Sequence, residues 1–336
     1  MKHFIIQLLI VLLLTSCFQA SYAQGNVISL KGTNFEMNGK PFEFTGVSFF
    51  NAIYNTEFNK SSKDRQLWIK KFNDYGINVF RVWCQWDNSL GLIDAGKDQT
   101  MYMSDGSLKN DVLGTLQEVL KDADDQGTVL LLALFSRESW RENIRLSDLA
   151  SDRAVAELTK ALKPYRNLVF QVWNEHNYRT LDYLKIIKQI DPDRIVTNSP
   201  GYSGDLGSQD ENFKLDYLSP HTSREDENHW EIASKEIAYL IQKFNKPVVD
   251  DEPARNGTFH FGGPKIQTLP LDHILHIYNV WKVGGYVIYH HDMFQTGYGN
   301  EAIPINGIPS PGFSAYHDQV FNILKEKEKY LRELRK

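Results

Sequence analysis

The stretch Leu168-Val169-Phe170-Gln171-Val172-Trp173-Asn174-Glu175 is an apolar run of strand length that ends in an amide and a carboxylate. A nearly continuous apolar run of this length is typical of a strand buried on both faces, as in parallel α/β sheets. Further runs of the same kind begin near residues 44, 77, 128, 194, 215, 247 and 285. Most of them are separated by segments with helical periodicity, at 63–75, 109–125, 152–163, 179–190, 231–244 and 270–282.

The spacing of these runs averages about 34 residues, which is the size of one strand-plus-helix unit. Eight such units that close on themselves predict an α/β protein with the (β/α)8 fold, the TIM barrel. No low-complexity linker interrupts the chain, so we expect residues 24–336 to form one domain. An Asn38-Gly39 turn predicts a β-hairpin over 35–42, at the N-terminal end of the barrel. Residues 199–214 show no convincing helix, which leaves an open doubly wound sheet as the alternative fold.

The composition excludes several classes of protein. The formal net charge of −5 gives no basic face, which argues against a nucleic-acid partner. The chain holds 7 Trp, 16 Tyr and 19 Phe residues, whose flat rings suit sugar faces, although most of them must be core. With Cys17 and Cys84 as its two cysteines, the chain has no disulfide framework, and we expect Cys84 to be a buried thiol.

The first residues resemble an export signal. Lys2 precedes an apolar run over residues 4–14, and small residues follow it. We expect residues 1–23 to be a signal peptide cleaved after Ala23, or a lipoprotein-type signal that ends before a lipidated Cys17. Both alternatives predict an exported protein that is periplasmic, secreted or lipid-anchored at the cell envelope. Contact with a membrane is expected only through such an anchor, because no later segment is apolar enough to span a bilayer.

Two of the apolar runs end in carboxylates. Residues 168–174 lead directly into Glu175, and residues 247–251 lead into Glu252. In a (β/α)8 barrel the chemistry lies where strands end, so these groups are expected to converge on one bond, one as acid and the other as nucleophile. Either residue alone is also consistent with a helix cap or a surface charge. The functional reading is favoured by further residues at strand ends: Arg81, Trp83, His221 and Tyr289.

A known family shares this combination of motifs. The motifs are Trp173-Asn174-Glu175, Glu252 after Val248-Val249-Asp250-Asp251, Arg81 within 78–83, and the opening residues 38–42 with Gly46. With them, the sequence resembles the retaining glycoside hydrolases of the cellulase and β-mannanase type, the family 5-like group of barrel enzymes.

The resemblance implies roles for individual residues. Glu175 would be the acid/base and Glu252 the nucleophile of a retaining double displacement. Asn174 would bind the sugar 2-hydroxyl, Arg81 would orient the nucleophile, and His221 would belong to the site. From the charges we expect Arg81 to keep Glu252 ionised and the pKa of Glu175 to be raised by its negative neighbour.

The sequence departs from the family pattern at three strand ends. Phe135-Ser136 stands where the family has a histidine, Ser223 where it has a tyrosine after His221, and Tyr289-His290-His291 where it has a tryptophan. These departures predict an unfamiliar substrate. Tyr202 is the candidate to replace the missing tyrosine as the partner of the nucleophile.

The remaining expectations concern the neighbours of the catalytic pair. Alternation along the strand predicts that Asp250 faces the site with Glu252, whereas Asp251 faces away from it. We expect neither a cofactor nor a metal, because adjacent residues such as His290 and His291 point to opposite faces. The candidate substrate-binding residues are Arg81, Trp83, Trp86, Trp140, Asn174, Tyr202, His221, Tyr289, His290 and His291.

The sequence thus predicts an enzyme, a glycoside hydrolase that cleaves O-glycosyl bonds of β-linked glycans, with an oligo- or polysaccharide as its partner. The alternative is a non-catalytic glycan-binding barrel derived from such an enzyme. The two catalytic carboxylates favour the enzyme, because a buried pair of like charges is costly without a function.

Overall fold

The computed structural model describes residues 25–50, 52–56, 58–86, 99–137, 140, 144–224, 228–253, 269–290 and 315–334. For residues 86, 315, 316 and 334 it describes the backbone only. The predictions for the signal peptide, Cys17 and His291 therefore concern residues outside the described ones, as does the prediction for the side chain of Trp86. No helix of the described part is long and apolar enough to cross a membrane.

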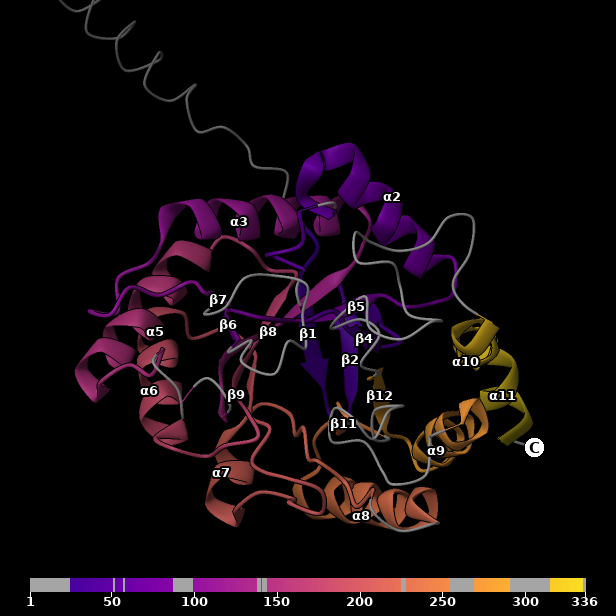
Figure 1. The fold of residues 1–336 in the computed structure, drawn as a ribbon. Coiled ribbons are helices and arrows are strands. Elements are labelled where there is room, and N and C mark those ends of the chain that lie inside the picture. Colours follow the sequence, from indigo (N-terminus) through magenta and orange to yellow (C-terminus); the bar gives the residue numbers. More distant parts are fainter. Residues whose placement is uncertain are drawn as a thin grey trace, which may run out of the picture.

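A parallel sheet of seven strands forms the centre of the molecule (Figure 1). Its strand order is β10-β9-β8-β5-β4-β12-β11, and every pairing in it is parallel. The strands are β4 (Thr45–Ser48), β5 (Val79–Trp83), β8 (Val129–Ser136), β9 (Leu168–Asn174), β10 (Val196–Thr197), β11 (Val249–Asp250) and β12 (Tyr286–Tyr289).

Residues 215–219 close this sheet into a barrel. Leu218 exchanges backbone hydrogen bonds with Pro247 and Val249 at one side, of 3.0 and 2.8 Å. Asp216 donates a backbone hydrogen bond of 3.0 Å to Val196 of β10 at the other side. The eight predicted strand positions are therefore all present, which confirms the TIM barrel, and the open sheet is wrong.

Helices surround the strands as a ring (Figure 1). The six predicted helices form within a few residues of their expected bounds. Three helices lie outside these six predicted ranges. Two of them, α10 and α11, are at the C-terminal end of the described chain. The third, α7, begins after Ser208, whose hydroxyl accepts a hydrogen bond from the Glu211 amide in a capping arrangement. The helices are α2 (Ser62–Asn73), α3 (Asn110–Asp125), α5 (Asp148–Leu162), α6 (Thr180–Ile190), α7 (Gln209–Lys214), α8 (His229–Phe244), α9 (Pro270–Lys282), α10 (Ala315–Lys325) and α11 (Lys327–Leu334), with a short 3-10 helix η1 (Phe58–Lys60).

A three-stranded antiparallel sheet, β1 (Ile28–Lys31), β2 (Asn34–Met37) and β3 (Lys40–Pro41), precedes the barrel. Asn38 and Gly39 have φ of 54° and 73°, as the predicted two-residue turn between β2 and β3 requires. Phe35 is fully buried against Phe44, with ring centroids 4.3 Å apart. This aromatic pair packs with inward residues of the strands and fills the N-terminal end of the barrel.

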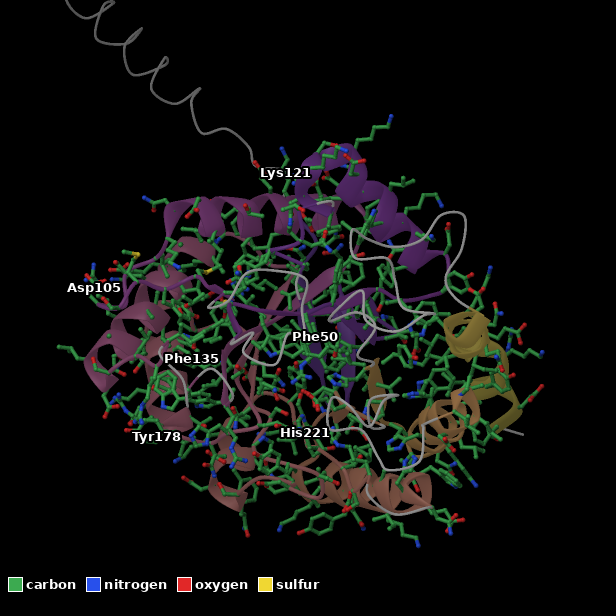
Figure 2. The ribbon with its side chains drawn as sticks, viewed as in Figure 1. Phe50, Asp105, Lys121, Phe135, Tyr178 and His221 are labelled. Atoms are coloured by element: carbon green, nitrogen blue, oxygen red, sulfur yellow. The ribbon has the colours of Figure 1, made fainter. Side chains whose placement is uncertain are left out.

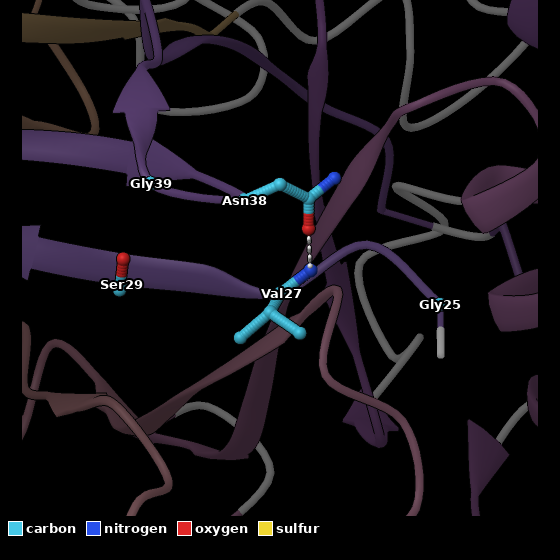
Figure 3. Close-up of a pocket in the computed structure, with 5 residues that line it drawn as sticks. All are labelled: Gly25, Val27, Ser29, Asn38 and Gly39. Atoms are coloured by element: carbon cyan, nitrogen blue, oxygen red, sulfur yellow. Dashed lines mark hydrogen bonds between the residues drawn. The ribbon is translucent and has the colours of Figure 1, made fainter. Parts of the chain in front are cut away.

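The hairpin also borders a hollow of about 410 Å³, shown in Figure 3. Gly25, Val27, Ser29, Asn38 and Gly39 line it, and Asn38 Oδ1 accepts a hydrogen bond of 2.8 Å from the Val27 amide. It lies at the N-terminal end, whereas the strand ends that carry the predicted site lie at the opposite end of the barrel. Another small sheet, β6 (Gln85–Trp86) with β7 (Gln99–Thr100), follows β5.

Alternation along the strands places a polar layer above an apolar one inside the barrel. Val79 and Val169 belong to the apolar inner cluster. Arg81 and Gln171 follow two residues later on the same sides of β5 and β9, and Arg81 Nε donates a hydrogen bond of 2.9 Å to Gln171 Oε1. The polar layer supports the strand ends above it.

Candidate active site

Glu175 and Glu252 meet at the C-terminal end of the barrel. Glu175 follows β9 and Glu252 lies two residues beyond β11, and their side chains are almost fully buried. Glu175 has a φ of 60°, a left-handed conformation that a non-glycine residue seldom adopts. One carboxylate oxygen of each glutamate and a ring nitrogen of His221 all lie within 4.8 Å of one another. His221 lies near the middle of the barrel in Figure 2.

Two guanidinium groups hold the Glu252 carboxylate. Oε1 accepts a hydrogen bond of 2.9 Å from Arg81 Nη1, and Oε2 accepts one of 2.8 Å from Arg224 Nη1. His221 Nε2 lies 3.6 Å from Oε1. Burial alone would raise the pKa of Glu252, but the positive charges of His221, Arg224 and Arg81 outweigh it and hold this pKa well below its ordinary range. The expected ion pair between Arg81 and Glu252 is present.

The other donors of Arg81 connect Glu252 to its neighbours. Nη2 donates a hydrogen bond of 2.6 Å to Asn174 Oδ1 and lies 3.1 Å from Asp251 Oδ2. Gln171, which accepts from Nε, also donates to Asp251 Oδ2. Arg81 is fully buried, so these contacts fix the plane of the guanidinium and, through it, the orientation of Glu252.

Arg224 is the site residue that the sequence reasoning missed. Its Nη1 binds Glu252, and its Nη2 donates a hydrogen bond of 3.2 Å to Glu175 Oε1, so one guanidinium bridges both carboxylates. Arg224 follows Ser223, where the family pattern has a tyrosine, but no local pattern in the sequence marks its role. Tyr202, the expected replacement, is 47% exposed, and the Arg137 guanidinium lies 3.9 Å from its ring centroid. Among the described residues, the hydrogen bonds to the Glu252 carboxylate come from Arg81 and Arg224.

The protonation of Glu175 differs from the expectation. Burial favours the neutral acid, but contact with His221 and the charge of Arg224 lower the pKa of Glu175 overall. His221 Nδ1 lies 3.4 Å from Glu175 Oε1, and its Nε2 lies 3.3 Å from Asp251 Oδ1. Burial disfavours the imidazolium, but Glu252, Asp251 and Glu175 raise the pKa of His221 to about 10. The predicted rise in the pKa of Glu175 is therefore wrong for this arrangement.

The two aspartates before Glu252 have exchanged their expected places. Asp251 faces the site and contacts Arg81 and His221. Asp250 faces the helices, where its Oδ2 accepts a hydrogen bond of 2.6 Å from Thr222 Oγ1 and lies 2.9 Å from His276 Nε2. The prediction was wrong because β11 ends at Asp250, so strand alternation does not extend to residues 251 and 252.

Several predicted sugar-binding residues are packing residues. Trp83 is fully buried, with Phe50 stacked at 4.2 Å and the Arg81 guanidinium 4.6 Å from its ring centroid, which contradicts its expected role as a stacking platform. Tyr289 points outward to His317 of α10, at 3.1 Å, so its expected substrate contact is also wrong. Trp140 packs edge-on against Trp173, with centroids 4.8 Å apart.

Other predicted residues do reach the site. Asn174 lies beside Arg81, and His290 Nδ1 lies 3.0 Å from Ser48 Oγ and 3.9 Å from Glu252 Oε1. Burial lowers the pKa of His290 to about 4, so this imidazole is neutral at pH 7. Cys84 is a free buried thiol, as expected, and its pKa is raised by burial to about 12.

The ligand atoms of Glu175, His221 and Glu252 are close enough together to hold a metal ion. The carboxylates, however, are already paired with two guanidinium groups, Arg81 and Arg224, and with His221. These cations neutralise the negative charge that a metal ion would need. The donor set therefore fits an organic ligand better than a metal.

The family model for cellulase (glycosyl hydrolase family 5) matches residues 35–230 of the sequence. This chain belongs to glycosyl hydrolase family 5. As a family 5 protein it is a glycoside hydrolase, an enzyme that hydrolyses O-glycosyl bonds. No curated protein sequence matches it.

Solved family 5 structures share its fold at low sequence identity. A glycoside hydrolase family 5 protein from Bacteroides vulgatus is 15% identical, with a TM-score of 0.64 over 90% of this chain and 70% of that one. A family 5 mannosidase from Rhizomucor miehei is 13% identical, with a TM-score of 0.61 over 93% and 98% of the two chains. A β-1,4-D-mannanase from Cryptopygus antarcticus is 14% identical, with a TM-score of 0.57 over 90% and 94%.

Proposed function

We propose that this family 5 chain cleaves β-linked glycans by a retaining double displacement, with Glu252 as nucleophile and Glu175 as acid/base. The observation that carries the proposal is the distance between them, since an oxygen of each carboxylate lies within 4.8 Å of the other. Retaining glycosidases hold their two carboxyl groups about 5–5.5 Å apart, whereas inverting enzymes need roughly 6.5–9.5 Å to admit a water.

The electrostatics support this division of labour. Glu252 has the lower pKa and two arginine partners, so it is the ionised group that attacks the anomeric carbon. Glu175 donates a proton to the leaving oxygen as the glycosyl–Glu252 ester forms. It then takes a proton from the water that hydrolyses this ester, which returns both carboxyl groups to their starting state.

The surrounding residues position this pair. Arg81 fixes the Glu252 carboxylate and places Asn174 beside it, where the amide can bind a sugar hydroxyl. His221 lies between the two carboxylates and carries a positive charge at pH 7 because of its raised pKa. Its charge offsets the repulsion between Glu175 and Glu252.

We also propose that the enzyme is exported, on the basis of the signal-like residues 1–23 and the polysaccharide type of substrate. Lipidation at Cys17 would hold it at the cell envelope, and cleavage after Ala23 would release it. Mass spectrometry of the mature N-terminus distinguishes the two.

Replacement of each glutamate tests the assignment. Glu175→Gln and Glu252→Gln should each lower kcat by at least about 1,000-fold, because each removes a group that acts on the reacting bond. The matched control is Glu157→Gln, on the outer face of α5, where Glu157 pairs with Arg153. Azide should yield a glycosyl azide of inverted configuration only with the nucleophile variant, Glu252→Gln, because there it attacks the anomeric carbon directly.

Two results would contradict the proposal. Substantial activity in Glu252→Gln would move the nucleophile to another carboxylate, with Asp251 as the nearest candidate. Binding on a glycan array without hydrolysis of any bound glycan by the unaltered protein would favour the non-catalytic glycan-binding barrel instead.

A further inference from the structure

Arg224 has a donor that the described residues leave unused. Its side chain is nine-tenths buried, and its Nε has no hydrogen-bond partner among them. Nη1 is taken by Glu252, and the edge formed by Nε and Nη2 meets Glu175 through Nη2 alone, at 3.2 Å. The Nε–Nη2 edge of an arginine can bind a carboxylate through two parallel hydrogen bonds. In Arg224 only Nη2 of this edge has a partner among the described residues.

The position of Arg224 conflicts with catalysis unless the substrate moves it away from Glu175. A retaining mechanism needs a protonated Glu175 beside the glycosidic oxygen, and the sugar must lie between the two carboxylates. The guanidinium now bridges this gap. A neutral sugar that took its place would leave a buried cation without its second counter-charge, which is unfavourable.

The charges of the site lead to the same requirement. Among the described residues, the carboxylates that accept hydrogen bonds from the Arg224 guanidinium are those of Glu175 and Glu252. When Glu175 takes up the proton that it must donate, Arg224 loses one of these two counter-charges. A carboxylate on the substrate would take its place.

A second arginine stands beside the first. Ser136 pairs with Asn174 in the register of β8 and β9, so Arg137 follows at the strand end next to Glu175. The Arg137 guanidinium covers one face of the half-exposed Tyr202 ring. The residue after Tyr202 contacts Arg224: Ser203 Oγ accepts a hydrogen bond of 2.9 Å from the Arg224 backbone amide. A second guanidinium, that of Arg137, therefore belongs to the strand end next to Glu175.

We propose that the sugar bound between Glu175 and Glu252 is a uronic acid, whose carboxylate pairs side-on with Nε and Nη2 of Arg224. In a pyranose uronate the carboxylate is attached to C5, which only the ring oxygen separates from the anomeric carbon. A cation that touches the nucleophile is therefore within reach of this carboxylate. The uronate displaces Glu175 from Nη2, and Glu175 takes up a proton from solvent and becomes the acid.

This inference rests on the proposed retaining function and adds the class of sugar. Its test compares uronate-containing polysaccharides with the same polymers after carboxyl reduction, which turns each carboxylate into a primary alcohol and keeps the other stereocentres. Neutral β-glucan and β-mannan complete the panel. We expect at least one acidic polymer to be cleaved with a kcat/KM roughly 10- to 100-fold above that of its reduced form, as a charged hydrogen-bonded pair implies.

Arg224 variants show whether this residue reads the carboxylate. Arg224→Gln lowers activity in general, because it also removes a partner of Glu252, so the readout is the ratio of kcat/KM between the acidic and reduced polymers. We expect this ratio to fall towards one in Arg224→Gln. It should take an intermediate value in Arg224→Lys, which keeps the positive charge but lacks the two parallel N–H donors of the guanidinium. The control is Arg153→Gln, an arginine outside the barrel paired with Asp105 and Glu157, which should leave the ratio unchanged.

The outcomes separate the two proposals. Cleavage of neutral or carboxyl-reduced polymers as fast as the acidic ones overturns the uronate proposal and leaves the retaining hydrolase intact. An acidic preference that persists unchanged in Arg224→Gln also overturns it, because another cation would then read the carboxylate. Hydrolysis of none of the polymers contradicts both proposals.

Discussion

Arg81→Gln removes the most connected cation of the site. Arg81 is fully buried and contacts the carboxylates of Asp251 and Glu252, at 3.1 and 2.9 Å, while it donates to Gln171 and Asn174. Breaking a buried ion pair from one side costs about 3–5 kcal/mol, because the partner charge stays buried. For a domain of this size, at about 2 °C per kcal/mol, the variant should unfold roughly 6–10 °C below the unaltered protein.

The loss should depend on pH. Since the pKa of Glu252 is depressed in the folded protein, its contribution to stability is complete above about pH 4.3, the unperturbed value for glutamate, and is lost as the pH falls through the lower folded pKa. Arg81→Gln raises the folded pKa of Glu252. The difference in Tm should therefore be largest near pH 7 and should shrink below about pH 4.

Differential scanning calorimetry of both proteins from pH 3 to pH 8 measures this difference. Arg153→Gln is again the control, since solvent screens its exposed ion pairs and their loss should shift Tm by no more than about 2 °C. A Tm within 1–2 °C of the unaltered protein at pH 7, or a larger loss that does not change with pH, would show that Arg81 does not hold the Glu252 charge.

Two further predictions use the neighbours of the catalytic pair. Asp251→Asn should lower kcat/KM at pH 7 by about tenfold or more, because it removes a negative partner of both Arg81 and His221. Asp250→Asn should act mainly on Tm, because Asp250 contacts Thr222 on the side of the helices. Steady-state kinetics and thermal melts of both variants measure this, and reversed effects would refute it. Trp83→Ala should cost about 3–5 kcal/mol of stability by leaving a cavity under Arg81; a variant with an unchanged Tm and a raised KM would restore Trp83 as a sugar platform.

The barrel was predictable because its signals are local. Each buried parallel strand gives an apolar run, and these runs recur at intervals of about one strand-plus-helix unit. The Asn38-Gly39 pair specifies the hairpin turn because both residues adopt a positive φ angle. The placement of Glu175 and Glu252 at strand ends followed from the same runs. Helix α7 was missed because a helix of six residues has too few turns for periodicity, although Ser208 and Glu211 carry its capping signal.

The charged surroundings of the site were less predictable. Asp251 turns into the barrel because β11 stops one residue earlier, and the point where a strand stops depends on its partners in the sheet. Arg224 lies 49 residues from Glu175 in the chain, and no local pattern marks the loop that brings its guanidinium between the carboxylates. Trp83 was misjudged because its neighbour Phe50 comes from another strand end and covers the ring face that a sugar would need.

The anomeric configuration of the first product tests the central claim most directly. Proton NMR during the first minutes of hydrolysis of a β-linked oligosaccharide records the new reducing end before it mutarotates. Because the Glu175 and Glu252 carboxylates lie within 4.8 Å, we expect the β-anomer to appear first, with the α-anomer growing only as mutarotation proceeds. Initial formation of the α-anomer would require a water between the carboxylates and would contradict the assignment of Glu252 as the nucleophile.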